Sequence, residues 1–151
     1  MVDFANRGGH VIGICNGFQI LCETGLLPGV LIRNASLTYI CRQQPLKVAT
    51  ADSAYTNQFK PGDTITVPIA HHDGNYAADA ELVARLKGED RVAFTYDGNP
   101  NGSVADIAGI LSDNRRVLGM MPHPERADET AHGNTDGANV FASLVNSLQT
   151  A

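Results

Sequence analysis

The sequence predicts an α/β fold that carries its reactive side chains at the carboxyl ends of buried strands. The apolar pair Val11-Ile12 leads into Gly13-Ile14-Cys15-Asn16-Gly17-Phe18, the pattern of a strand that turns sharply into a helix. A second apolar run, residues 117–121, passes directly into Pro122-His123-Pro124-Glu125-Arg126. From about residue 136 onward, apolar side chains recur at helical spacing, which predicts a final helix packed on the core.

The first half of the chain combines one βα unit with short β segments. The strand at residues 11–14 is followed by a helix over about residues 17–24, which ends at Gly25 and the turn at Pro28-Gly29. Polar and proline-containing links then separate short β-like segments at residues 37–41, 46–50 and 64–69. These segments predict an antiparallel insertion.

The second half alternates helix and strand again. Asp79 can cap a short helix, and apolar runs predict strands at residues 92–96 and 107–111. Between these strands, residues 97–102 are similar to the opening of a calcium-binding loop. The twelfth position is Ala108, where such a loop needs a glutamate. We therefore interpret this segment as a turn-rich connection.

Cys15 is the side chain best placed for chemistry. Gly13 and Gly17 flank it and allow a tight turn, so its sulfur is expected to stand exposed above the sheet. The helix that begins near Asn16 directs free N–H groups and its positive dipole end toward the sulfur, which favours the thiolate over the thiol. The N–H of Asn16 is also a natural oxyanion donor. The competing interpretation is a small buried hydrophobic residue, as many lone cysteines are.

His123 and Glu125 supply the other parts of a nucleophilic triad. Pro122 and Pro124 restrict the backbone around His123, so a rigid extended loop is expected to hold the imidazole at the end of its strand. Because residues two apart in an extended segment point the same way, Glu125 can hydrogen-bond the far nitrogen of the ring. A thiol, a base within reach and a group that orients the base are the parts of a triad. The alternative is a surface loop with solvated side chains.

Composition argues against several classes of partner. The length of 151 residues suits one domain, and a hydrophobic fraction of 43% can build a core. The net charge of −5, without a Lys/Arg cluster, argues against nucleic acid or an anionic membrane. The cysteines form no disulfide framework, so a reducing, cytoplasmic compartment is expected, with Cys22 and Cys41 as packing residues. No apolar run approaches membrane-spanning length, and no signal-like segment follows Met1.

Four segments together carry a resemblance to a known family. They are Gly-Ile-Cys-Asn-Gly-Phe-Gln-Ile-Leu at residues 13–21, Ala-His-His-Asp-Gly-Asn-Tyr at 70–76, Asn-Gly-Ser-Val-Ala-Asp-Ile-Ala-Gly at 101–109, and Gly-Met-Met-Pro-His-Pro-Glu-Arg-Ala at 119–127. With them the chain resembles the class I glutamine amidotransferases, and among these the glutaminase subunits of phosphoribosylformylglycinamidine synthases. The resemblance runs over nearly the whole chain and implies one amidotransferase domain at residues 1–151, with a flavodoxin-like, three-layer α/β sandwich. Phe18 favours the small, separate-subunit type.

The resemblance implies a reaction. Cys15 would be the nucleophile, His123 the general base and then acid, and Glu125 its orienting carboxylate. Glutamine would be hydrolysed to glutamate and ammonia through a thioester on Cys15. In this family the ammonia passes to a synthetase subunit, which works with a small accessory subunit and uses ATP and Mg to make formylglycinamidine ribonucleotide in purine biosynthesis. No cofactor is expected in this chain.

The resemblance also implies substrate-binding residues. Asn16 and Gln19 would lie at the start of the elbow helix, although Gln19 can also be interpreted as an ordinary solvated helix residue. His71, His72 and Asp73 lie where related amidotransferases hold the amino-acid end of the substrate with loop backbone. No metal site is expected there, because adjacent histidines in an extended segment point apart and no third ligand has useful spacing.

Full-length members of this family begin with additional βα units, so the chain is expected to lack the N-terminal part of the domain. Residues 2–7 would be the end of the helix before the elbow strand. The family's glycine-rich loop, which supplies a second oxyanion donor, lies in the missing part. We therefore expect the 151 residues alone to be a poor glutaminase, because losing one oxyanion donor costs on the order of 10²-fold in rate.

Two other functions stay open at the level of sequence. A cysteine hydrolase or redox protein of the same fold would use the same elbow, and glutamine would then not protect Cys15 from alkylation. A shortened, non-catalytic interaction module would bind the synthetase subunit without releasing ammonia.

Overall fold

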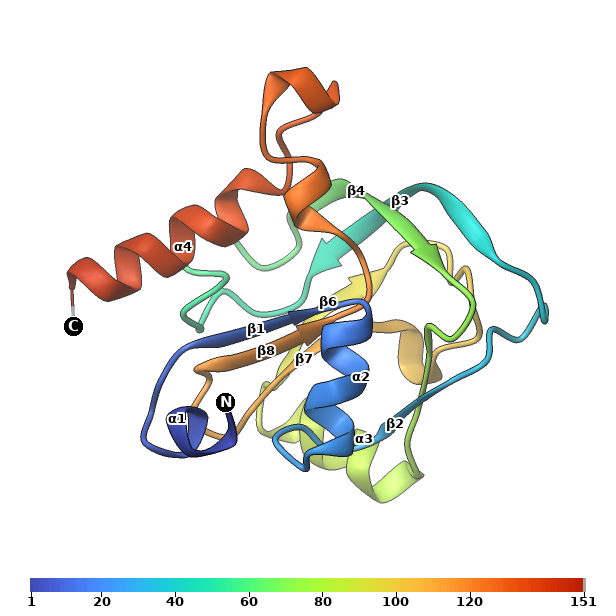
Figure 1. The fold of residues 1–151 in the computed structure, drawn as a ribbon, viewed down its shortest axis with the longest axis horizontal. Coiled ribbons are helices and arrows are strands. Elements are labelled where there is room, and N and C mark those ends of the chain that lie inside the picture. Colours follow the sequence, from blue (N-terminus) through green and yellow to red (C-terminus); the bar gives the residue numbers. More distant parts are fainter. Residues whose placement is uncertain (151) are drawn as a thin grey trace.

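The computed structural model describes residues 1–150 and shows a curled mixed sheet with helices on both faces (Figure 1). The large sheet has the strand order β1-β8-β7-β6-β3-β4. Its strands are β1 (Val11–Ile14), β3 (Ile40–Val48), β4 (Thr64–His71), β6 (Val92–Tyr96), β7 (Ile107–Leu111) and β8 (Val117–Met120). Strands β1 and β8 are parallel, and the other neighbours in this sheet are antiparallel. Two short strands, β2 (Val30–Ile32) and β5 (Asn75–Ala77), form a separate antiparallel pair.

The helices make the outer layers. They are α1 (Val2–Asn6), α2 (Asn16–Glu23), α3 (Ala80–Gly88) and α4 (Ala138–Gln149), with single 3-10 turns η1 (Val104–Asp106), η2 (Pro124–Arg126) and η3 (Thr130–His132). One core packs α2 and α3 against the sheet, and a second core packs α4 and the segment before β4 against its other face. Along β8, alternate side chains enter the two cores, as the strand period requires. These three layers confirm the predicted α/β architecture.

Several elements lie where the sequence predicts them. Strands β1, β6 and β7 have the predicted bounds, and α2 and α4 occupy the predicted helical segments. The carboxylate of Asp79 caps α3 by accepting a hydrogen bond from the N–H of Leu82 at 2.8 Å. Apolar runs and a capping residue were therefore sufficient signals for these elements.

Strand β3 corrects the prediction of two short segments at residues 37–41 and 46–50. It is one strand that continues through Pro45 and pairs with both β4 and β6, so this region extends the main sheet rather than forming an insertion. The carbonyl of Pro45 accepts the N–H of Asp97 at 3.0 Å, so the proline nitrogen also faces the β6 side. There the carbonyl of Asp97 accepts the side-chain amide of Gln44 at 3.1 Å, so the missing N–H of proline leaves it paired.

The β2/β5 pair escaped the sequence analysis because each strand has only three residues. Its central residue Tyr76 is buried and stacks on Phe18 of α2, with ring centroids 5.7 Å apart. The Tyr76 hydroxyl donates to the carbonyl of Pro28 at 2.8 Å. These contacts fix the segment after β4 against the first turn of α2.

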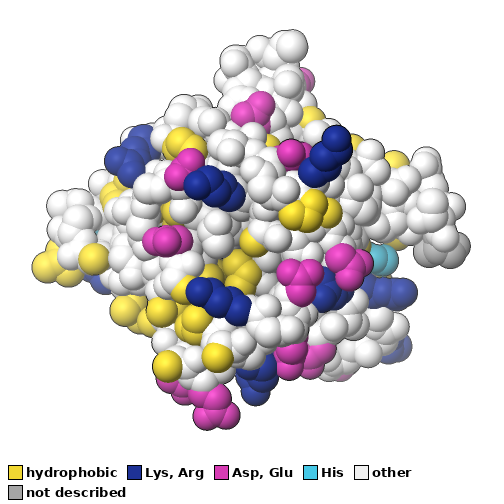
Figure 2. Space-filling model, turned by 180° about the vertical axis from the view of Figure 1, so that it is seen from behind, with side chains coloured by type: hydrophobic (Ala, Val, Ile, Leu, Met, Phe, Trp, Pro, Cys, Tyr) yellow, Lys and Arg dark blue, Asp and Glu magenta, His cyan; other side chains and the backbone are white. Residues whose placement is uncertain are grey.

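The outer surface mixes charges of both signs. On the face seen in Figure 2, acidic and basic side chains are interspersed rather than gathered by sign. Within residues 1–150, the helices lack the combination of length and apolarity needed to cross a bilayer.

Candidate active site

Cys15 occupies a strained corner between β1 and α2. Its backbone has φ 53° and ψ −109°, and its N–H donates to the carbonyl of Met120 on β8 at 2.8 Å. A non-glycine residue with positive φ stores strain and is held there by its surroundings. The side chain is half-buried rather than fully exposed. The predicted elbow is therefore present in the backbone.

The two glycines around Cys15 have different roles. A Cβ built at Gly13 would lie 2.4 Å from Cδ1 of Leu21 and 2.6 Å from the carbonyl oxygen of Gly17, whereas a Cβ at Gly17 meets nothing within 4 Å. Gly13 is thus needed because α2 passes directly over β1. Gly17 meets no such neighbour, so α2 packs on β1 without needing a glycine there.

His123 lies at the same edge of the sheet as Cys15. The β1/β8 register pairs Ile14 with Met120, so both chains leave adjacent parallel strands at their carboxyl ends. The N–H of His123 donates to the carbonyl of Pro68 on β4 at 2.8 Å, and the imidazole is buried, with 7% exposure. The strands β1, β8 and β4 therefore fix the position of the ring.

Glu125 holds the imidazole from the outer side. Its Oε1 is 2.6 Å from Nδ1 of His123, and the Arg126 guanidinium lies 3.6 Å from the same oxygen. The predicted extended loop is wrong, because Pro124–Arg126 forms the 3-10 turn η2 with His123 as its N-cap. This turn curls the chain and brings the carboxylate back to the ring.

The Cys15 thiol is not predisposed to ionise. Burial raises its pKa above the ordinary value; the Asn16 N–H and the Arg126 guanidinium oppose this effect, and the Glu125 carboxylate adds to it. The prediction that the helix N-terminus makes the thiolate the favoured form is therefore wrong, because burial outweighs the helix N–H. Sγ contacts the carbonyl of Ala70 at 3.7 Å, and Nε2 of His123 is buried without a partner in residues 1–150. The imidazole thus has a free nitrogen with which to receive the thiol proton.

The segment after β4 forms a side wall of the site. The Gln19 amide donates to the carbonyl of Asp73 at 2.9 Å, so Gln19 is tied to this loop and is not simply solvated. The side chains of His72 and Asp73 lie on the outside. Asp73 pairs with Arg33 at 3.1 Å, and the His72 ring packs edge-on against Tyr39 with centroids 5.2 Å apart. The backbone, rather than these two side chains, is what the loop offers to a ligand.

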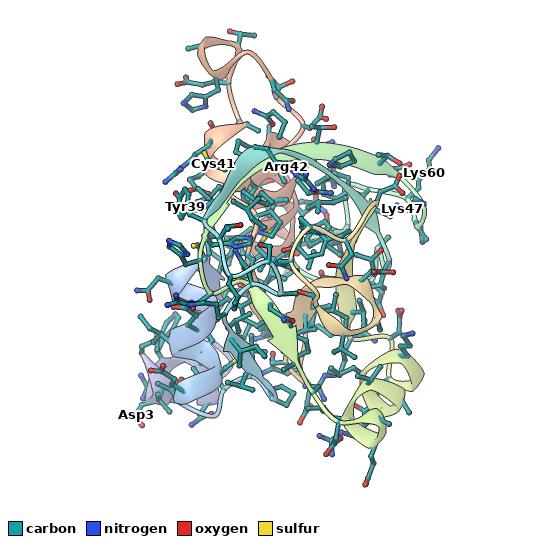
Figure 3. The ribbon with its side chains drawn as sticks, turned by 90° about the vertical axis from the view of Figure 1, so that its right-hand side faces the viewer. Asp3, Tyr39, Cys41, Arg42, Lys47 and Lys60 are labelled. Carbon is teal, nitrogen blue, oxygen red and sulfur yellow. The ribbon has the colours of Figure 1, made fainter. Side chains whose placement is uncertain are left out.

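Figure 3 shows Tyr39 and Cys41 together at one edge of the molecule, where β3 begins. Cys41 is exposed, so its prediction as a packing residue is wrong. It lies opposite Ala70 in the β3/β4 register, and Ala70 is the residue whose carbonyl contacts the Cys15 sulfur. An exposed thiol outside the predicted triad therefore lies near the site and can serve as an internal reference for reactivity.

A buried polar network fixes the same loop from within. The Asn101 side chain donates to the carbonyl of Gly74 at 2.7 Å, and the Ser103 hydroxyl lies 3.3 Å from the same oxygen. Asn34 is fully buried and bonds to His71, Gly74 and Thr38. The sequence analysis did not select Asn34, because a single polar residue between apolar segments gives no periodic signal.

Within residues 1–150, no group of three metal-ligating side chains comes together.

Comparison with known proteins agrees with this geometry. Residues 1–140 match the model of the CobB/CobQ-like glutamine amidotransferase domain. The chain is 67% identical over 144 residues to the phosphoribosylformylglycinamidine synthase subunit PurQ of Roseobacter denitrificans, covering 95% of this chain and 65% of that protein. It is 62% identical over 151 residues to the PurQ subunit of a Jannaschia species, covering 100% of this chain and 68% of that protein.

A solved structure extends the similarity to three dimensions. The fold superposes on the structure of PurLQS from Thermotoga maritima with a TM-score of 0.88 at 42% identity, covering 97% of this chain and 66% of the matched chain. The chain thus spans about two thirds of the length of these relatives. The family model covers most of the chain and its cysteine elbow, and on this evidence the chain belongs to the CobB/CobQ-like glutamine amidotransferase domain family.

Proposed function

We propose that this chain is a glutaminase subunit of phosphoribosylformylglycinamidine synthase, which hydrolyses glutamine to glutamate and ammonia. The observation that supports the proposal is that the Cys15 elbow and the His123–Glu125 pair follow adjacent parallel strands at their carboxyl ends. The names of the relatives support the choice of synthase, since two of them are PurQ subunits of that enzyme.

The proposed first half-reaction makes a thioester. Nε2 of His123 takes the thiol proton as Sγ of Cys15 attacks the side-chain carbonyl carbon of glutamine, and the Asn16 N–H stabilises the oxyanion. Because burial raises the pKa of Cys15, proton transfer accompanies the attack rather than preceding it. Glu125 steadies the imidazolium through Nδ1. His123 then gives its proton to the departing nitrogen, and ammonia leaves as the C–N bond breaks.

The second half-reaction returns the enzyme to its starting state. His123 removes a proton from water, whose oxygen attacks the thioester carbon, and the C–S bond breaks. The sulfur recovers a proton, and glutamate is released. One glutamine and one water thus give one glutamate and one ammonia, and the thiol chemistry calls for no cofactor in this chain.

Substrate binding is assigned to the wall beside the triad. Gln19 and the backbone of residues 71–73 would hold the amino-acid end of glutamine, with Asn16 at the reacting carbonyl. The hydrogen bond from Gln19 to Asp73 supports this assignment, because it fixes the loop at the start of α2. In this proposal His72 and Asp73 act through their main chains.

The proposal includes partners and a compartment. The ammonia would pass to a synthetase subunit, assisted by a small accessory subunit, and ATP and Mg would be used on the synthetase. The similarity to a chain of a PurLQS structure supports this assembly. A cytoplasmic location is also proposed, since free cysteines without a disulfide framework are typical of a reducing compartment. Neither nucleic acid nor membrane is a proposed partner, which agrees with the net charge of −5.

An alkylation experiment tests the proposal with a control inside the same chain. The protein is treated with iodoacetamide with and without glutamine, and modification of each cysteine is followed by mass spectrometry. Glutamine should slow modification of Cys15 and leave that of exposed Cys41 unchanged. Equal modification of Cys15 with and without glutamine would favour a cysteine hydrolase or redox protein instead.

A further inference from the structure

The side wall of the site contains a short loop at residues 72–74, between β4 and β5, which we call the wall loop. Two contacts place it beside the Cys15 elbow. The carbonyl of Ala70, two positions before the loop, lies 3.7 Å from the Cys15 sulfur. Within the loop, the carbonyl of Asp73 accepts a hydrogen bond at 2.9 Å from Gln19, in the first turn of α2.

Each carbonyl of the wall loop has a hydrogen-bond donor. The carbonyl of His72 accepts the main-chain N–H of Asn34 at 2.7 Å, and that of Asp73 is bonded to α2. The carbonyl of Gly74 accepts the side-chain amide of Asn101 at 2.7 Å. Of the three N–H groups of the loop, only that of Gly74 has a partner among residues 1–150. The N–H groups of His72 and Asp73 are therefore the polar main-chain groups that the loop leaves for a ligand.

Two buried asparagines clamp the loop at Gly74. Asn34 has 0% exposure and Asn101 has 1%. The side-chain oxygen of Asn34 accepts the Gly74 N–H at 3.0 Å, while Asn101 donates to the carbonyl of the same residue. A side chain has no room at position 74, because a Cβ built there would lie 2.4 Å from the ring of His71. The conformation of the wall loop is thus held at one residue from two sides.

Other partners fix the orientation of both amides. Nδ2 of Asn34 donates to the carbonyls of His71 and Thr38 at 2.8 and 2.9 Å, so Oδ1 faces Gly74. Oδ1 of Asn101 accepts the N–H and the hydroxyl of Ser103 at 3.1 and 2.7 Å, so Nδ2 faces Gly74. Removal of either amide leaves a polar main-chain group of the loop without this partner, which loosens the loop.

We propose that Asn34 and Asn101 are positioning residues that hold the wall loop ready for glutamine, and so lower KM for this substrate without contacting it. This inference rests on the proposed glutaminase function. A loop that is fixed before the substrate arrives loses little conformational entropy on binding, whereas a loose loop must be ordered by the ligand. Because the ordered loop binds substrate and transition state alike, the clamp acts on KM rather than on kcat.

The test compares three asparagine-to-alanine variants. Asn34→Ala and Asn101→Ala each open one side of the clamp. Asn57→Ala is the matched control, because it removes buried hydrogen bonds to Ser143 and Ser147 of α4 but none to the wall loop. KM and kcat are measured for each variant assembled with the synthetase subunit, at a temperature where circular dichroism shows all of them folded.

A second measurement reports binding without turnover. The concentration of glutamine that halves the rate of Cys15 alkylation by iodoacetamide is determined for each variant. This concentration should rise in parallel with KM, whereas the rate of Cys15 alkylation without glutamine should stay at the wild-type value, because the clamp does not contact the sulfur.

The expected result is a change in KM alone. Asn34→Ala should raise KM for glutamine about tenfold, which corresponds to the loss of about one hydrogen bond. Asn101→Ala should raise it about threefold, because the Ser103 hydroxyl lies 3.3 Å from the Gly74 carbonyl and can donate to it instead. At saturating glutamine, kcat should stay within about twofold of wild type in both variants. Asn57→Ala should leave KM unchanged.

The outcomes distinguish the inference from the proposed function. Wild-type KM in both clamp variants, a fall in kcat at unchanged KM, or an equal rise of KM in Asn57→Ala would overturn the positioning role and leave the glutaminase function standing. A wild-type complex that neither binds nor hydrolyses glutamine would overturn the proposed function itself. Should Asn34→Ala fail to fold, Asn101→Ala decides: a raised KM supports the inference, and an unchanged KM overturns it.

Discussion

The substitution Gly13→Ala, with Gly17→Ala as its matched control, tests how the elbow is built. Both glycines lie two residues from Cys15, and the same methyl group is added at each position. At Gly13 the new carbon would lie 2.6 Å from the backbone oxygen of Gly17 and 2.4 Å from a Leu21 methyl, whereas at Gly17 it meets nothing within 4 Å. The two variants therefore differ in packing rather than in chemistry.

The expected magnitudes follow from those distances. Ordinary carbon contacts begin near 3.4 Å, so α2 must move away from β1 to admit the methyl group of Gly13→Ala. Overpacking of this kind costs about 1–3 kcal/mol. Gly17 is a helical residue, and Ala in its place should stabilise the protein by about 0.5–1 kcal/mol. The free energies of unfolding of the two variants should thus differ by about 1.5–4 kcal/mol.

Urea-induced unfolding followed by circular dichroism measures this difference. The midpoint should fall for Gly13→Ala and rise slightly for Gly17→Ala, with equal slopes. Gly13→Ala should also lower kcat, because displacement of α2 moves the Asn16 N–H relative to the sulfur. Equal stability of the two variants would refute the close approach of α2 to β1.

Three further predictions address other parts of the structure. The pKa of His71 is about 4 in the folded state against about 6.5 when unfolded, so the unfolded state binds more protons between these values. The neutral His71 therefore makes its full contribution to the free energy of unfolding above about pH 6.5, and this contribution falls by up to about 3 kcal/mol toward pH 4. Urea unfolding should show this dependence of stability on pH in wild type but not in His71→Gln. Glu125→Gln should reduce kcat by about 10²-fold or more with little change in Tm, since the imidazolium loses its carboxylate; a full rate would contradict the role of Glu125. Asn57→Ala removes hydrogen bonds to Ser143 and Ser147 of α4 and should cost about 1–3 kcal/mol, measured as a lower unfolding midpoint with kcat retained.

The sequence was sufficient for elements whose signal is local. The runs at residues 92–96 and 107–111 are apolar and bounded by turn residues, and the structure shows strands with these bounds. The Asp79 cap likewise depends on a contact between near neighbours. Pro45 suggested a break in β3, because the sequence does not reveal that the Gln44 side chain bonds the Asp97 carbonyl that faces the proline nitrogen.

The candidate site also has some features that the sequence indicates and others that only the folded chain shows. The Cys15 elbow and the contact of Glu125 with His123 are short-range features, and the sequence indicated both. The raised pKa of Cys15 depends on how deeply the folded chain buries the thiol. A prediction based on the helix N-terminus alone therefore gave a lowered pKa, which is the wrong direction. The role of Asn34 beside His71 joins residues 37 positions apart, and a contact of this kind is visible only in the folded chain.

The most direct test of the central claim is detection of a glutamyl thioester on the sulfur at position 15. The protein, assembled with the synthetase subunit, is mixed with isotopically labelled glutamine, quenched in acid within one turnover and digested for mass spectrometry, with Cys15→Ala as the control. The account predicts a glutamyl adduct on the peptide that contains Cys15, and release of labelled ammonia that the substitution abolishes. Ammonia release that persists in Cys15→Ala would contradict it.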